Sequence, residues 1–178
     1  ILGLKLFALA AVAGLALGAT NMITSGPIAQ QAVVAADMAR RSVLPTAQTF
    51  AEQTAPQGLI SAYAGYDAAG KLTGKTGTIV TKGYGGEIEI TVGVDLAGSV
   101  TGVTVGGSSF AETAGLGARA KEAWFGEQFV GLASPISLAK DGGAIDAITS
   151  ATITSRAVTG AVNNAVQALG SLNPPTEG

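Results

Sequence analysis

The sequence predicts an α+β protein: an apolar amino-terminal helix precedes a small domain in which helices pack on one face of a twisted antiparallel sheet. Three patterns predict it. An apolar run opens the chain, alternating residues and Asp-to-Gly turns fill its middle, and apolar residues at every fourth position end it. Of the 178 residues 47% are apolar and only 12% charged, whereas a soluble domain has about 25% charged residues. The composition therefore favours one globular domain with a membrane segment.

The residue types that the chain lacks exclude several kinds of chemistry. Without Cys or His, it has no disulfide, no thiol redox chemistry, no metal site built on these ligands and no triad that needs an imidazole. Ten Lys and Arg stand against twelve Asp and Glu, a net charge of −2 that gives no basic surface for nucleic acid. Any redox role must therefore use a bound cofactor, and nucleic acid is excluded as a partner.

Residues 1–23 are expected to form one transmembrane helix. Residues 6–19 are an unbroken apolar run, and as a helix the whole segment reaches roughly 34 Å, enough for a hydrocarbon core of about 30 Å. By the positive-inside rule Lys5 favours a cytoplasmic amino end, so the rest of the chain would lie outside the cytoplasm. The alternative is a secretory signal peptide, which also has a basic residue before an apolar run. Because the chain starts with Ile1, we expect that a few residues precede it.

Residues 24–50 are expected to form a helical stalk between the membrane and the domain. Pro27 suits the first turn of this helix, and Arg40 and Arg41 suit its last turn. Pro45 then ends the helix. The simplest role of such a segment is that of a solvated spacer.

The globular domain is expected over residues 51–173, followed by a tail over residues 174–178. Apolar and polar side chains alternate along residues 87–94, which predicts a strand with one buried and one solvent-exposed face. Residues 67–70 and 95–98 both place Asp at the start of a turn and Gly where a positive φ is needed. These two segments predict successive hairpins and hence an antiparallel sheet.

Two helices are expected in the rest of the domain. Trp124, Phe125 and Phe129 predict a short helix whose aromatic side chains anchor the core. A second helix is expected from Thr152 to Gly170, because apolar residues recur there at every fourth position. Its apolar positions are Ile153, Ala157, Val158, Ala161, Val162, Ala165, Val166 and Leu169.

Three segments are candidates for ligand binding, and none is a catalytic constellation. Residues 146–155 are rich in hydroxyl groups and enter the last helix, residues 82–86 hold three Gly around Tyr84, and residues 112–117 form another Gly-containing loop. In one interpretation the hydroxyl groups cap the helix and the Gly residues form turns. In the other, the helix start binds a phosphate, and the Gly residues let the backbone approach a flat ligand.

The run from Asp146 to Thr152 resembles the flavinylation motif of the FMN-binding domain family: Asp, two variable residues, Ser or Thr, Gly or Ser, Ala, then Thr or Ser. With the amino-terminal span and both Gly-containing loops, most of the chain is similar to the G subunit of the Rnf ion-translocating ferredoxin:NAD oxidoreductase. It is more distantly similar to the C subunit of the sodium-translocating NADH:quinone reductase. Two positions depart from the family pattern, since Ser150 stands where Gly is commonest and Ala114 where Pro is usual.

The resemblance implies one FMN per chain, joined through its phosphate to the hydroxyl of Thr152, with Thr154 as the fallback. It also implies that a magnesium-dependent flavin transferase installs the FMN from FAD outside the cytoplasm. Asp146 would then serve recognition by this transferase, or organise the loop. The other residues expected at the cofactor are Thr149, Ser150, Ala151, Tyr84, Gly85, Glu112, Thr113, Leu116 and Gly117.

The function implied by the resemblance is that of a non-catalytic electron-carrier subunit in a membrane-bound, ion-translocating redox complex. Its partners would be the other membrane subunits of that complex. Two alternatives stay open. A pilin-like or adhesion module without a cofactor would also combine an apolar amino-terminal helix with an antiparallel sheet. An exported enzyme would need its own active site, against which the missing His and Cys count.

Overall fold

The structure, a computed structural model, describes residues 2–174, so the predicted tail lies outside the described residues apart from Pro174. The chain divides into two compact units, of which the first ends at Asp37 and the second starts at Met38. Helix α1 (Leu2–Val43) forms the first unit and contributes its last turns to the second. The folded domain therefore includes residues ahead of position 51, where the sequence analysis starts it.

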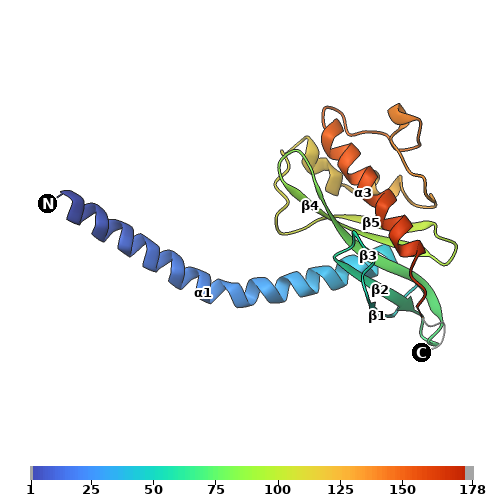
Figure 1. Ribbon diagram of the computed structural model, residues 1–178, viewed down its shortest axis with the longest axis horizontal. Helices are drawn as coiled ribbons and strands as arrows, with labels where there is room; N and C mark the ends of the chain where they lie inside the picture. The colour runs from blue at the N-terminus through green and yellow to red at the C-terminus, as the bar shows by residue number, and fades with distance from the viewer. Residues whose placement is uncertain (1, 175–178) are drawn as a thin grey trace. The chain divides into compact units, whose positions relative to one another are not determined.

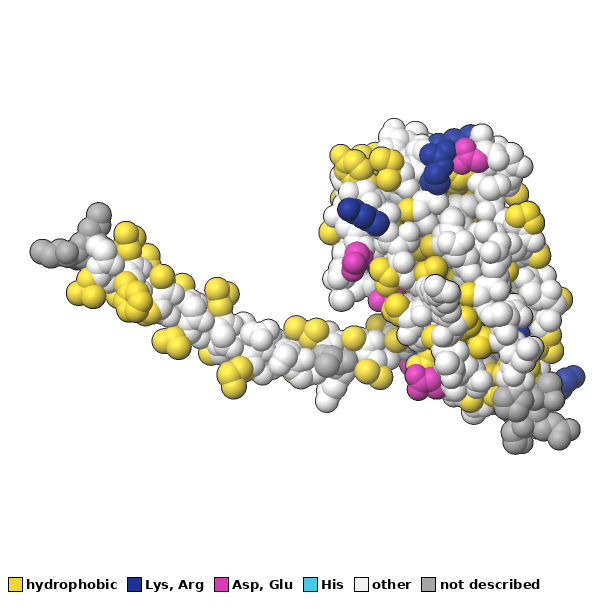
Figure 2. Space-filling view, in the orientation of Figure 1, with side chains coloured by type: hydrophobic (Ala, Val, Ile, Leu, Met, Phe, Trp, Pro, Cys, Tyr) yellow, Lys and Arg dark blue, Asp and Glu magenta, His cyan; other side chains and the backbone are white. Residues whose placement is uncertain are grey.

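Helix α1 is long and apolar enough to cross a membrane. The described side chains between Gly3 and Ala36 are exposed, and Figure 2 shows hydrophobic side chains along this part of the helix. The helix continues without interruption through Pro27, where the sequence analysis expected a new helix to begin. Proline removes one helical hydrogen bond and its ring crowds the carbonyl four residues earlier, but the residues on both sides of Pro27 continue the helix here. The end of α1 at Val43, just before Pro45, agrees with the prediction.

Five strands form one antiparallel sheet in the order β1-β2-β3-β4-β5, so that each strand pairs with its neighbour in sequence. The strands are β1 (Thr49–Gln53), β2 (Ser61–Tyr66), β3 (Leu72–Lys82), β4 (Glu87–Asp95) and β5 (Val100–Gly106). The predicted antiparallel sheet is confirmed. The sequence analysis does not predict β1, a short strand with mostly exposed side chains.

Both predicted hairpin turns are present. The carboxylates of Asp67 and Asp95 each accept two backbone N–H bonds within their turn, at 2.8 to 3.0 Å. Gly70 and Gly98 close the turns with φ of 77° and 84°, a conformation that favours glycine. The repeated Asp-to-Gly spacing therefore has the same physical cause in both hairpins.

Helices cover one face of the sheet, where α3 (Thr152–Gly170) lies across the strands (Figure 1). The core between them includes Phe125 and Phe129, both fully buried, as predicted. Phe125 belongs to α2 (Ala123–Glu127), which follows the 3-10 helix η1 (Gly117–Lys121). A second 3-10 helix, η2 (Ala139–Asp141), precedes α3. The predicted apolar face of α3 is wrong at its first position, because Ile153 is 58% exposed and lines a cavity.

The end of α1 and the residues after it cover part of the opposite face of the sheet. A Cβ at Gly93 or Gly102 would collide with the backbone of Val43, and a Cβ at Gly65 or Gly74 would collide with Leu44. Glycine at these strand positions thus lets the segment lie directly on the sheet. The predicted packing of helices on one face of the sheet is thus accompanied by a short covering segment on the other face.

The burial of Thr91 corrects the strand prediction at one residue of β4. The alternation along β4 predicts a solvent-exposed side chain at this position, but Thr91 is only 6% exposed. Its hydroxyl lies 3.3 Å from that of Thr78 on β3, so the two buried hydroxyl groups form a hydrogen bond with each other. This face is polar in composition, yet its middle is buried.

Candidate cofactor-binding site

A cavity of about 420 Å³ opens at the amino-terminal end of α3. Three segments line it: the loop between β3 and β4, the loop after β5, and the turn that leads into α3. The lining residues are Tyr84, Glu112, Thr113, Leu116, Gly117, Ser150, Ala151, Thr152, Ile153 and Thr154. Ligand pockets have volumes of about 300 to 1,000 Å³, so this cavity is large enough for a small organic cofactor.

The sequence analysis names every one of these lining residues as a candidate except Ile153. It also names Asp146, Thr149 and Gly85, which do not line the cavity. Asp146 and Thr149 lie on the turn before α3, and Gly85 is exposed beside Tyr84. The helical period assigns Ile153 to the core, and only its position next to Thr152 could have indicated the cavity.

The first turn of α3 has no side-chain cap. Its N-cap residue is Ala151, which carries no acceptor, so the N–H groups of Thr152, Ile153 and Thr154 have no hydrogen-bond partner among the described residues. Simple capping of the helix by the hydroxyl-rich run is therefore not observed. Free N–H groups and the positive end of the helix dipole make this end of the cavity suitable for an anion such as a phosphate.

The two threonine hydroxyls of this turn differ in their surroundings. Thr154 is 1% exposed, and its hydroxyl donates a hydrogen bond of 2.8 Å to Oε2 of Glu112. Thr152 is partly exposed at the cavity, and its hydroxyl has no hydrogen-bond partner among residues 2–174. Of the two, the hydroxyl of Thr152 is the one accessible to an incoming group.

Two side chains that the sequence analysis did not assign hold the turn before α3. The amide of Gln128 accepts a hydrogen bond from the backbone N–H of Asp146 at 2.7 Å and donates to its carbonyl at 3.4 Å. The hydroxyl of Ser155 accepts from the backbone N–H of Ile148 and donates to the carbonyl of Ala151, both at 2.9 Å. The turn is thus fixed at both ends, although its cavity side is open.

Within this turn Ser150 has a left-handed backbone, with φ of 61°, and no other non-glycine residue in the described part of the chain has a positive φ. An L-residue in this conformation costs about 1 to 2 kcal/mol, a cost that glycine avoids. This is a physical reason for glycine to be commonest at this motif position.

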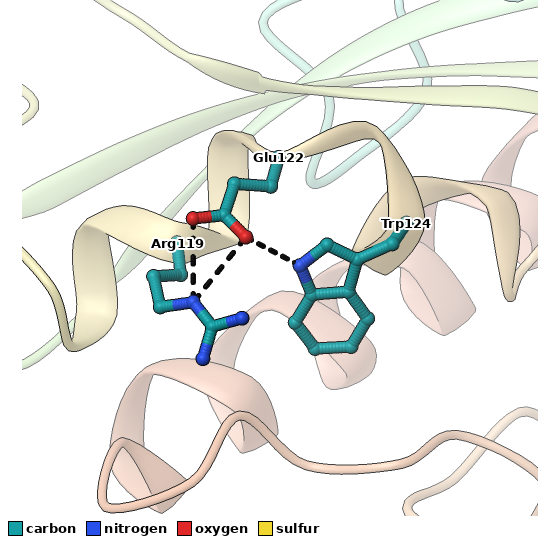
Figure 3. Close-up of polar contacts among 3 residues, drawn as sticks. All are labelled: Arg119, Glu122 and Trp124. Atoms are coloured by element: carbon teal, nitrogen blue, oxygen red, sulfur yellow. Dashed lines mark hydrogen bonds and ion pairs between the residues drawn. The ribbon is translucent and has the colours of Figure 1, made fainter.

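A polar cluster fixes the chain after the cavity loop (Figure 3). The carboxylate of Glu122 accepts a hydrogen bond of 2.6 Å from Nε1 of Trp124 and one of 3.2 Å from Nε of Arg119. The indole ring meets Phe125 edge to face, with ring centroids 5.6 Å apart. The indole N–H of Trp124 thus bonds Glu122 while its ring packs against Phe125, which supports the predicted structural role of these aromatic residues.

Residues 83–167, which include all three walls of the cavity, match the family model of the FMN-binding domain. This match, which spans β4, β5, the cavity and most of α3, identifies this part of the chain as an FMN-binding domain. Among solved structures, the C subunit of the Na⁺-translocating NADH-quinone reductase from Parabacteroides distasonis has 23% sequence identity. It superposes with a TM-score of 0.49 over 64% of each chain.

Curated relatives give the particular family. The chain is 37% identical to the G subunit of the Na⁺-translocating ferredoxin:NAD⁺ oxidoreductase complex of Acetobacterium woodii, over 97% of this chain and 92% of the relative. It is 33% identical to the G subunit of the proton-translocating complex of Clostridium ljungdahlii, over 88% of this chain and 83% of the relative. The chain belongs to the G-subunit family of ion-translocating oxidoreductase complexes, which confirms the family resemblance found in the sequence.

Proposed function

We propose that this chain is the electron-carrier subunit of a membrane-bound, ion-translocating redox complex, and that one FMN is attached to Oγ1 of Thr152 through a phosphoester bond. A bound flavin accepts and donates one or two electrons, so the protein supplies position and electrostatics. Family membership and the FMN-binding domain support the redox role.

The contrast between the two threonines carries the choice of attachment site. Thr152 presents an accessible hydroxyl beside the free N–H groups of α3, whereas the hydroxyl of Thr154 is buried and donates to Glu112. A phosphodiester keeps one negative charge, which the N–H groups and the helix dipole can stabilise. The described cavity lining contains no Lys or Arg, so this stabilisation must come from the backbone.

We assign roles to the remaining cavity residues from the kind of surface that each exposes and from its position. Tyr84, Leu116 and Ile153 are 72%, 40% and 58% exposed at the cavity and offer apolar surface to the isoalloxazine ring. Ser150 and Ala151 would lie beside the phosphate, with Thr113 and Gly117 on the facing wall. Asp146 and Thr149 lie outside the cavity, where the flavin transferase could recognise them before the flavin is attached.

An electron carrier needs one partner that reduces its flavin and another that oxidises it. We propose that other membrane subunits of the complex exchange electrons with the FMN, and that α1 anchors the chain among them. Because Lys5 precedes the apolar run, the amino end would lie in the cytoplasm and the domain on the outer side of the inner membrane. A covalent bond would prevent loss of the cofactor into that compartment.

The attachment can be tested on the full chain produced together with a flavin transferase. We expect the denatured wild-type protein to fluoresce on a gel under ultraviolet light and to carry one FMN on the peptide that contains Thr152. Thr152→Ala should give a folded protein with no covalent flavin. As matched controls, Thr152→Ser retains a hydroxyl and Thr49→Ala removes an exposed one on β1, outside the motif and the cavity, and both should keep the flavin. Covalent flavin on Thr152→Ala would show that the attachment site is wrong.

A further inference from the structure

The carboxylate of Glu112 connects all three walls of the cavity. Oε1 accepts a hydrogen bond of 2.9 Å from the backbone N–H of Gly85, and Oε2 accepts one of 2.8 Å from the hydroxyl of Thr154. Gly85 belongs to the loop between β3 and β4, Thr154 to the first turn of α3, and Glu112 to the loop after β5. One side chain thus joins segments that lie 27 and 42 residues away in the sequence.

The carboxylate of Glu112 fits between the walls because the residues closest to it are glycines. A Cβ at Gly83 would collide with Oε1 of Glu112, and a Cβ at Gly117 would collide with Oε2. Neither glycine has a positive φ, so close approach and not backbone conformation requires glycine at both positions. A Cβ at Gly85 would likewise collide with the carbonyl of Ala111. The glycines of both loops are therefore fitted to Glu112 and its own loop.

The charge of Glu112 makes direct binding of a phosphate an unsuitable role for it. Glu112 is the single charged residue of the described cavity lining, and no Lys or Arg forms an ion pair with it among the described residues. A carboxylate repels a phosphate in the same cavity. Its two hydrogen bonds are charge-assisted, a class about twice as strong as bonds between neutral groups. The carboxylate is therefore better suited to holding the walls than to holding the ligand.

We propose that Glu112 is a positioning residue: it fixes the loop that carries Tyr84 against the first turn of α3, and in this way it orients a flavin attached to Thr152. The identity of that ligand rests on the proposed function. The contacts themselves need no ligand, so Glu112 organises the cavity before any cofactor arrives.

The ligand-independent part is tested on the flavin-free full chain in detergent, in a Thr152→Ala background, by NMR. Removing the carboxylate in Glu112→Ala should accelerate hydrogen exchange of the Gly85 amide by roughly tenfold or more. Glu112→Gln keeps the side-chain shape and an oxygen that can accept from this amide, so it should restore most of the protection of Gly85. The amide of Gly98, held in the distant hairpin by the carbonyl of Asp95, is the internal control.

The cofactor-dependent part is tested on flavin-loaded protein. We expect Glu112→Ala to keep FMN on Thr152 but to lose at least about half of the visible circular dichroism of the flavin, because the walls no longer fix the ring. Glu112→Gln should retain most of this signal, since its amide can still accept from Gly85 and donate to Thr154. Adding Thr154→Val to Glu112→Ala should cause no further loss, because both changes break the same hydrogen bond.

The results separate the two proposals. A wild-type protein without covalent FMN overturns the proposed attachment, while exchange of the Gly85 amide still decides the role of Glu112. Unchanged exchange of Gly85 in Glu112→Ala, or unchanged flavin dichroism in the loaded variant, overturns the positioning role even when FMN is found on Thr152.

Discussion

The two ends of α3 differ in the hydrogen-bond partners that the rest of the protein gives them. At the carboxyl-terminal end, Nζ of Lys75 on β3 donates hydrogen bonds to the carbonyls of Leu169, at 3.1 Å, and Leu172, at 2.5 Å. At the amino-terminal end, the N-cap residue Ala151 has no side-chain acceptor and the first N–H groups of the helix lie at a cavity. The protein thus satisfies one end of the helix with its own lysine and leaves the other end open.

This difference separates stability from function within one helix. The lysine places a positive charge at the negative end of the helix dipole, where it stabilises the fold. The open end keeps its donors available for a ligand, although Gln128 and Ser155 hold the turn before it in place. A helix start with a fixed backbone and free N–H donors is typical of an anion-binding site. Loss of the contacts at the carboxyl-terminal end should therefore reduce stability and leave flavin attachment intact.

The largest effect on stability is expected from Lys75→Met. Methionine keeps the apolar stem but removes both hydrogen bonds to the helix end, so the free energy of unfolding should fall by about 2 kcal/mol. Urea unfolding of the full chain in detergent, followed by circular dichroism, measures the change. Covalent flavin attachment should remain, because the cavity lies at the other end of α3.

Lys71→Met is the matched control for this comparison. Lys71 lies just before the start of β3, but it is exposed and its side chain makes none of the hydrogen bonds that Lys75 makes. Its replacement should change the free energy of unfolding by less than about 0.5 kcal/mol. Equal losses in the two variants would show that Lys75 does not cap the helix.

A smaller effect, of opposite sign, is expected from Ser150→Gly at the open end. Glycine adopts the left-handed backbone of this position without strain, so the free energy of unfolding should rise by about 1 kcal/mol. The control is Thr149→Gly, which adds a flexible residue where φ is not positive and should reduce stability. Urea unfolding of flavin-free protein measures both variants. A loss of stability in Ser150→Gly would contradict the strain argument.

The features that the sequence predicts are those with local causes. Asp67 and Asp95 form their turns with residues two to four positions away, so the spacing alone contains the information. The end of α3 near Gly170 and the core positions Phe125 and Phe129 follow from helical spacing in the same way. The family resemblance adds most of the cavity residues, because it marks three segments that the fold brings together.

The features that the sequence does not predict depend on segments that are distant along the chain. Thr91 is buried on the face of the sheet that Val43 and Leu44 partly cover, and no alternation pattern can show such a contact between distant segments. Ile153 fits the helical period but lines the cavity, although Ala151, two residues earlier, already belongs to the core. Gly83 and Gly117 resemble turn glycines in sequence, but the close approach of Glu112, together with Ile88 at Gly83 and Thr154 at Gly117, explains them.

The smallest effect is expected from the ion pair that supports the open end of α3 from outside. Arg156 on α3 donates hydrogen bonds of 2.9 to 3.1 Å to both carboxylate oxygens of Asp141 at the end of η2. The hydrogen bond from Arg156 lowers the pKa of Asp141 below its ordinary value of 3.8. In the range between the folded and unfolded pKa, the unfolded chain then binds more protons than the folded chain. The pair therefore stabilises the fold above the unfolded pKa, and this contribution is lost as the pH falls through the folded pKa.

Asp141→Asn should accordingly lower the thermal midpoint slightly near neutral pH, and the difference from the wild type should disappear on strong acidification. The effect is small because both side chains are exposed and water screens their attraction. Salt at about 1 M, which shortens the screening length to about 3 Å, should also reduce the difference. Thermal unfolding followed by circular dichroism across this pH range measures it. A difference that grows with acidification would mean that Asp141 is protonated more easily in the folded chain, and that the open end of α3 gains nothing from this pair.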